Sequence, residues 1–136
     1  MTRASTSKGV GKNTLGGKNP INIADKFTRF SEHWSPRVIA EMNDYQFKLA
    51  KVEGEFVWHQ HDDTDEVFLV VDGTLEIQLR DRSVTLEAGE MYVVPKGVEH
   101  RPVAAQECKI MLVEPRGVVN TGRVESELTA PTDEWV

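Results

Sequence analysis

The amino-acid sequence predicts an all-β domain, a barrel or a sandwich, with one short helix before it. From residue 37 to residue 113, apolar and polar residues alternate in short runs, which is the period of a half-buried strand. Turn-forming pairs such as Asn43-Asp44 and Asp72-Gly73 separate these runs. No internal repeat is visible, and 136 residues are enough for one domain with its own hydrophobic core.

Composition divides the chain into three parts. Residues 1–20 are rich in Gly, Ser, Thr, Asn and Lys and are expected to form a flexible arm. Residues 21–117 hold the helix and the β-domain, and residues 118–136 form a polar, turn-rich tail. We therefore expect a single folded domain between two polar ends.

Residues 22–33 are predicted to be helical. Ile23, Phe27 and Phe30 recur at the spacing of one helical face, so they would form one apolar stripe. The helix is expected to end before Pro36, because the residue before a proline avoids the helical conformation.

Seven runs with a period of two are predicted to be strands. They cover residues 37–42, 45–52, 65–71, 74–79, 83–86, 91–94 and 107–113.

Charge and cysteine content exclude several functions. The net charge is −6 with no basic stripe, which argues against binding to nucleic acids or to anionic membranes. No apolar run is long enough to span a bilayer, and the N-terminus lacks the apolar stretch of an export signal. Cys108 is the single cysteine and is expected to be a buried, inert thiol. These features indicate a reducing, cytoplasmic environment.

Four side chains are candidates for a metal site. His59 and His61 are two apart, so in a strand they point to the same side. Glu66 follows a polar stretch, residues 62–65, which would let the chain turn back beside them. His100 must come from another strand. Three imidazoles and one carboxylate are suitable ligands for a divalent transition metal.

The alternative is that these histidines are structural or exposed, as most single histidines are. Glu66 argues against this, because it shares a strand face with Phe68 and Val70. A carboxylate on an apolar face is costly unless a cation lies nearby.

Two segments resemble the two motifs of the cupin superfamily. The first motif is matched by Gly54, His59, His61, Glu66 and Gly73, and the second by Gly89, Pro95, Gly97 and His100. The match covers residues 54–104 and extends through the flanking strands to about 37–114. It departs from the pattern at Ala104, where the second motif ends in Asn, and in the spacing between Gly54 and His59.

This resemblance implies a double-stranded β-helix, the jelly-roll barrel of the cupins. It implies one Fe, Mn, Ni or Zn ion held by His59, His61, Glu66 and His100, and frequently a homodimer. The chain is most similar to small single-domain bacterial cupins.

The expected function is a small metalloenzyme, an oxygenase, isomerase or lyase acting on a small polar molecule. Four protein ligands leave one or two coordination positions for water, substrate or dioxygen. A non-catalytic sensor or sugar-binding cupin, and a structural cupin with an idle site, are the alternatives. The sequence identifies no catalytic residue.

Neighbouring residues provide further candidates. Phe56 and Phe68 are candidates for a pocket wall, whereas Trp58 alternates with His59 and is expected to pack outside the barrel. Arg101 follows His100 and could hold an anionic substrate, although it alternates outward.

Overall fold

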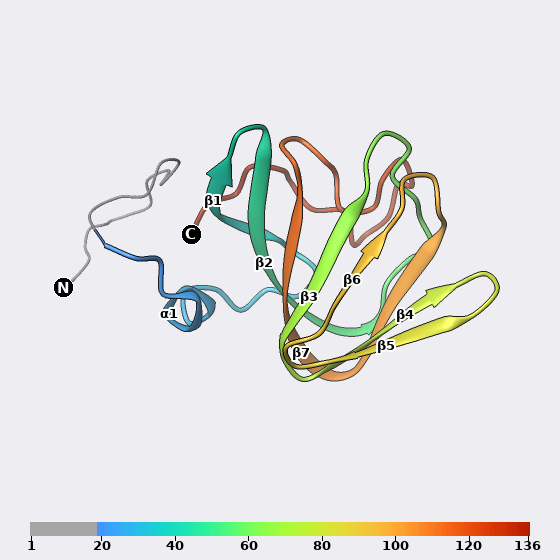
Figure 1. Cartoon of the computed structure of the whole chain (residues 1–136), viewed down its shortest axis with the longest axis horizontal. Helices are drawn as coiled ribbons and strands as arrows, with labels where there is room; N and C mark the ends of the chain where they lie inside the picture. The colour runs from blue at the N-terminus through green and yellow to red at the C-terminus, as the bar shows by residue number, and fades with distance from the viewer. Residues whose placement is uncertain (1–18) are drawn as a thin grey trace.

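The computed structural model describes residues 19–136, which form a short helix and a rolled antiparallel sheet (Figure 1). The predicted all-β class and the short N-terminal helix are therefore confirmed. The predicted arm lies outside the described residues apart from positions 19 and 20, and the predicted domain boundaries remain a prediction. The strands are β1 (Arg37–Met42), β2 (Tyr45–Glu55), β3 (Glu66–Asp72), β4 (Thr74–Leu79), β5 (Ser83–Glu87), β6 (Met91–Val94) and β7 (His100–Pro115).

The helix α1 spans Ile23–Phe27, so the predicted helix over residues 22–33 is too long. Asn22 caps its start by accepting the backbone N–H of Asp25 at 2.9 Å. The chain leaves the helix after Phe27, yet Phe30 remains buried with Phe27 against β1 and β2. The apolar stripe was correct, but such a short helix depends on this packing, and Phe30 reaches the same cluster without helical geometry.

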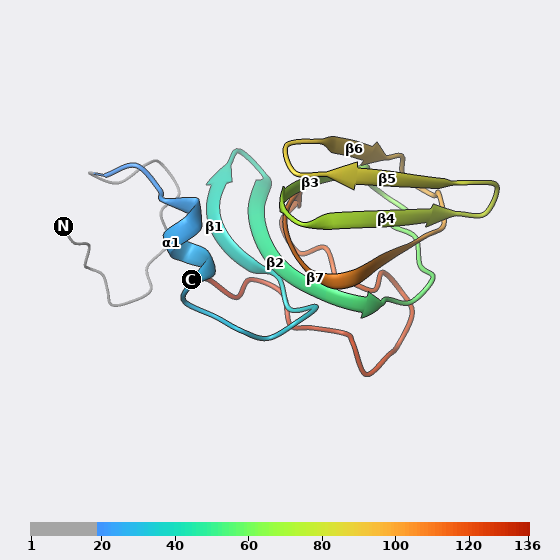
Figure 2. The same ribbon diagram turned by 90° about the horizontal axis from the view of Figure 1, so that it is seen from below.

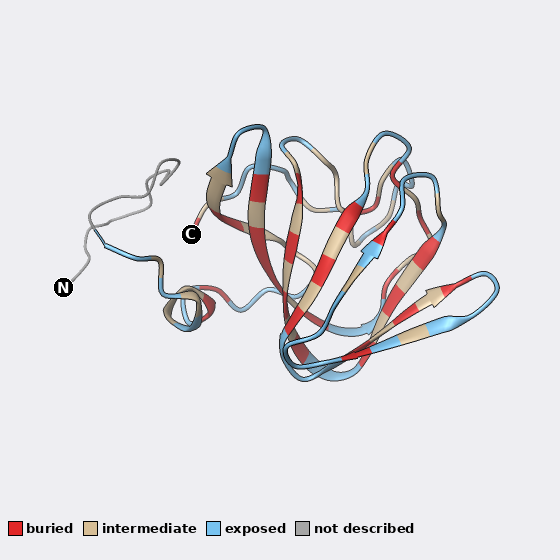
Figure 3. Cartoon of the chain, viewed as in Figure 1, coloured by how far each residue is buried: buried red, intermediate tan, exposed pale blue. Residues whose placement is uncertain are grey.

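The long strand β7 joins the two parts of the barrel. It pairs with β2 along most of its length, while on its other side the second half pairs with β3 and the first residues pair with β4. The strand order is β1-β2-β7-β3-β6, and β5 pairs with β4 (Figure 2). Buried and exposed residues alternate along the strands, so one side of the rolled sheet forms the core (Figure 3).

The first half of β7 was missed, because the prediction began this strand at residue 107. Pro102 interrupts the apparent strand pattern, and a proline cannot donate to a sheet ladder. Its carbonyl oxygen still accepts the N–H of Phe56 at 3.0 Å, so pairing continues through it. As a result, His100 is the first residue of a strand.

The interior is mainly apolar. Cys108 is fully buried, as expected, and burial raises the pKa of its thiol to about 11, so it stays protonated at neutral pH. The other members of this core include Val52, Phe68, Val70, Leu75, Ile77, Ile110 and Leu112.

The C-terminal segment packs back onto the barrel. Gly122 adopts φ +63, and a Cβ at this position would run into the backbone oxygen of Gln60. Arg123 pairs with Asp62 at 2.9 Å. The segment therefore lies directly against the stretch that carries His59 and His61. In the described part of the chain, no helix has both the length and the apolar character needed to cross a membrane.

The close approach at Gly122 predicts a large effect of Gly122→Ala. Gly117 is the matched control, because its φ is +87 and a Cβ there would meet no atom within 4 Å. We expect Gly117→Ala to lower the free energy of unfolding by about 1 kcal/mol through backbone strain alone. Gly122→Ala should lower it by on the order of 3 kcal/mol, because Gln60 must also move. Urea unfolding of both variants measures this, and equal losses would show that the contact is unimportant.

Candidate metal centre

The structure brings His59, His61, Glu66 and His100 together. All four are buried, and one nitrogen or oxygen of each lies within 4.8 Å of those of the others. His59 and His61 lie between β2 and β3, Glu66 begins β3, and His100 begins β7. Two backbone hydrogen bonds between His59 and His100, at 3.1 and 2.9 Å, hold the two segments side by side.

Two of the imidazoles have a defined orientation. Nδ1 of His59 lies 2.9 Å from the carbonyl oxygen of Val57, and Nδ1 of His100 lies 2.9 Å from that of Val98. A carbonyl oxygen only accepts hydrogen bonds, so each Nδ1 carries the proton. In the neutral rings the lone pair is then on Nε2. Backbone carbonyls commonly orient metal-binding histidines in this way.

The Nε2 atoms of two imidazoles lie next to the Glu66 carboxylate. Its Oε1 lies 3.3 Å from Nε2 of His61 and 3.2 Å from Nε2 of His100. A neutral His100 would direct its lone pair at an anionic oxygen, which is unfavourable unless a proton or a cation lies between them. Nε2 of His61 is buried and makes no hydrogen bond to the described residues.

This arrangement fits a divalent transition metal. Nitrogen and oxygen ligands bind such ions at about 2.1 Å, so ligands on opposite sides are about 4.2 Å apart. The observed limit of 4.8 Å is slightly wider, and small side-chain rotations would close the difference. A buried cluster of three histidines and one glutamate therefore suits metal binding.

Burial and neighbouring side chains shift the pKa values of His59 and Glu66. Burial, followed by the nearby His100, lowers the pKa of His59 to about 4, so this ring is neutral and able to bind a metal at neutral pH. Burial alone would raise the pKa of Glu66, but the imidazoles of His100 and His61 beside its carboxylate hold that pKa well below its usual range. Glu66 is therefore an anion in the interior.

Lys48 and Glu114 support Glu66 and were not predicted. Nζ of Lys48 lies 2.8 Å from Oε2 of Glu114, and both side chains are almost fully buried. Burial, and then the charge of Glu66, raise the pKa of Glu114 well above its usual range. The two buried carboxyl groups therefore lie close enough to shift each other's pKa in opposite directions. The alternation along β2 could have indicated that Lys48 is buried, since Lys48 shares a strand face with Ala50 and Val52, which belong to the core.

The remaining candidates divide between cavity and surface. Phe56 and Phe68 line a cavity beside His59, as expected for a pocket wall. The guanidinium of Arg80 lies 3.8 Å from the ring centre of Trp58, outside this cavity. Arg101 points away from the cluster and donates to the side chain of Gln78 at 2.8 Å.

Comparison with known proteins identifies the family. The family model of the cupin domain matches residues 46–114, which include all four clustered side chains. The chain belongs to the cupin domain family. The suspected resemblance is thus confirmed.

Similar proteins extend over most of the barrel. The Bacillus subtilis (strain 168) protein YdbB is 42% identical over 85 residues, which are 62% of this chain and 73% of YdbB. A solved cupin-2 domain protein from Shewanella frigidimarina NCIMB 400 is 73% identical, covers 71% of this chain and 94% of its own, and has a TM-score of 0.70. Protein NMB1881 from Neisseria meningitidis is 36% identical over 71% of this chain and 99% of its own, with a TM-score of 0.66.

The lowered pKa of His59 predicts acid sensitivity of the metal-free protein. The folded pKa of about 4 lies below the ordinary value of 6.5, so between these values the unfolded chain binds more protons. The contribution of His59 to the free energy of unfolding is therefore fully present above pH 6.5. It should fall by roughly 3 kcal/mol as the pH drops to 4.

Urea unfolding at several pH values measures this loss, and His59→Gln is the control because it does not titrate. Groups that do not interact with His59 contribute equally to both proteins, so the difference between the two curves reports the titration of His59 and of its electrostatic neighbours. Parallel curves for the wild type and the variant would contradict the assignment.

Proposed function

We propose that this cupin holds one divalent transition-metal ion with His59, His61, Glu66 and His100 and that it is a small metalloenzyme. The observation that carries the proposal is the set of buried nitrogen and oxygen acceptors that face one another around Glu66. Such a cluster has its lowest energy when a cation occupies its centre. Three nitrogens and one oxygen suit Fe, Mn, Ni or Zn.

The chain's own residues prepare the site for such an ion. The carbonyl oxygens of Val57 and Val98 keep His59 and His100 in the tautomer that presents Nε2. The buried carboxyl of Glu114, paired with Lys48, lies beside Glu66 and supports its carboxylate. When bound, the ion would supply a Lewis acid with open coordination positions, or dioxygen chemistry if it is iron. Oxygenase, isomerase and lyase reactions are the classes that this chemistry allows.

Non-catalytic ligand binding is the second candidate, and one observation favours it. Among the described residues that line the cavity beside the cluster, His59 and Glu66 are the only titratable ones, and both are assigned to the metal. No independent general base therefore faces a bound molecule in this cavity. The homodimer and the cytoplasmic location remain predictions.

Metal analysis of the purified protein tests the proposed ligands. We expect one equivalent of metal in the wild type and its loss in His61→Ala, with a fall in affinity larger than the roughly 10- to 100-fold typical of supporting residues. His33→Ala is the control, because His33 pairs with Glu107 at the surface, away from the cluster. Equal metal content in the wild type and His61→Ala would reject the site.

Turnover separates the two candidate functions. The metal-loaded protein is incubated with diketones, catechols and phosphorylated sugars while oxygen uptake and product formation are followed. An enzyme releases product that the His61→Ala variant does not form. A binding protein shows ligand-dependent rises in melting temperature with no product from any compound.

A further inference from the structure

An apolar cavity adjoins the metal cluster. It has a volume of about 30 Å³, and His59 and Glu66 form one end of it. Its floor is part of the barrel interior and comes from Ala50, Val52, Phe68, Ile110 and Leu112. The floor is therefore rigid, and a molecule held on it would lie beside the proposed metal ligands.

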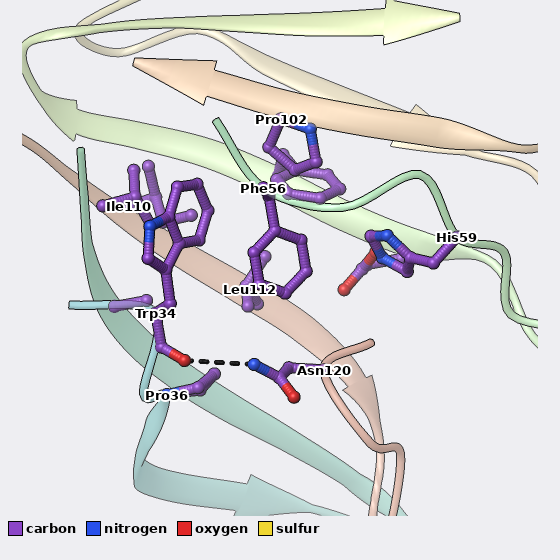
Figure 4. A pocket seen from close by; sticks show the side chains of 12 residues that line it. Trp34, Pro36, Phe56, His59, Pro102, Ile110, Leu112 and Asn120 are labelled. Carbon is purple, nitrogen blue, oxygen red and sulfur yellow. Dashed lines mark hydrogen bonds between the residues drawn. The ribbon is translucent and has the colours of Figure 1, made fainter. Parts of the chain in front are cut away.

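Aromatic side chains cover this floor. Phe56 lies between Trp34 and His59 (Figure 4). The rings of Trp34 and Phe56 are stacked with centres 4.6 Å apart, and Phe56 meets His59 edge-on at 5.2 Å. Offset stacks and edge contacts are the arrangements that aromatic rings prefer, so another ring could take part in the same packing.

Trp34 belongs to the loop between α1 and β1, and backbone hydrogen bonds hold it in place. Its φ is +60, which is uncommon for a residue with a side chain. Its backbone N–H donates to the backbone carbonyl of Lys51 at 2.9 Å, and its indole N–H donates to the backbone carbonyl of Glu53 at 3.0 Å. Its own carbonyl accepts from Asn120 at 3.0 Å (Figure 4). Such strain persists where the surroundings hold it, and it is found often at ligand-binding sites.

The cavity offers a ligand no free polar group apart from the metal cluster. The side-chain amide of Asn120 is already hydrogen-bonded within the protein. Its NH2 group donates to the backbone carbonyls of Trp34 and Leu128, and its oxygen accepts from the N–H of Ala130. None of the described lining residues is a lysine or an arginine. A charged or many-hydroxyl molecule would lose its hydration here without new hydrogen bonds, which is unfavourable.

We propose that this cavity binds the hydrocarbon ring of a small, uncharged substrate that presents one oxygen to the metal cluster, and that Trp34 moves aside to admit it. The substrate class rests on the proposed function, whereas the ring-binding cavity does not. The sequence favoured a small polar molecule, and the apolar lining favours a phenol-like one instead. A volume of about 30 Å³ holds about two waters and no ring, so entry requires one wall to move. The side chain of Trp34 is that wall, because it is only partly buried and one hydrogen bond, from its indole N–H to Glu53, is all that must break for it to rotate outward. Its backbone stays in place, held by Lys51 and Asn120.

Binding of phenol to the metal-free protein tests the cavity without metal or turnover. Tryptophan fluorescence and melting temperature are followed as phenol is added, with pyruvate and glucose as polar comparisons. We expect phenol to change the fluorescence and raise the melting temperature, and the polar compounds to do neither. Trp34→Phe should lose the fluorescence change but keep the rise in melting temperature, because Trp58 and Trp135 lie outside the cavity lining.

A second variant blocks the cavity from its floor. Ala50→Leu places a larger side chain in the space and should weaken phenol binding at least tenfold. The zinc content of the same variant, measured separately, should stay at the wild-type level. Unchanged phenol affinity in Ala50→Leu, or tighter binding of pyruvate or glucose than of phenol, would overturn the proposal.

The two proposals fail in different ways. If the wild type binds zinc but shows no response to phenol, the apolar cavity is rejected and the metal centre stands. If it responds to phenol but binds no zinc, the metal centre is rejected and the ring-binding cavity stands.

Discussion

The burial of the Glu66 carboxylate among imidazole nitrogens is the constraint on which the rest of this structure depends. An anion in a β-barrel interior needs positive charge or strong hydrogen-bond donors nearby. Lys48 meets part of this need through Glu114. The nitrogens of His61 and His100, at 3.3 and 3.2 Å from Glu66, provide a place where a cation would meet the remainder. The electrostatics of the core and the proposed chemistry are therefore one feature of the molecule.

The barrel brings distant segments to this point through backbone pairing. β7 begins at His100 and pairs there with β4, while His59 and His100 exchange two backbone hydrogen bonds. In the same stretch, the backbone of Gln60 packs against Gly122. The stretch that carries His59 and His61 is thus held both by backbone pairing with β7 and by contacts with the C-terminal segment. Precise placement of this kind is what a metal centre requires, because ligand distances vary within narrow limits.

Sequence reasoning succeeded wherever the signal was local. The period of two located the seven strands, and the spacing of His59 and His61 placed them on one side of the chain. The polar turn of residues 62–65 was correctly expected to bring Glu66 beside them. It failed where a local signal misled. Pro102 hid the first half of β7, and the apolar stripe through Phe30 extended the helix too far. Lys48 and Glu114 were passed over because charged residues are usually exposed, although strand alternation placed Lys48 on the face of Ala50 and Val52.

By itself, the sequence determined the fold class, the family and the four candidate ligands, since each depends on periodicity or on spacing within a short motif. Only the tertiary structure decided which way the imidazole nitrogens point, that the buried Lys48–Glu114 pair lies beside Glu66, and that Trp34 covers an apolar cavity beside His59. These features join residues from separate strands and loops. Their contacts depend on how the sheet rolls and where the loop between α1 and β1 crosses it, and no spacing along the chain records either.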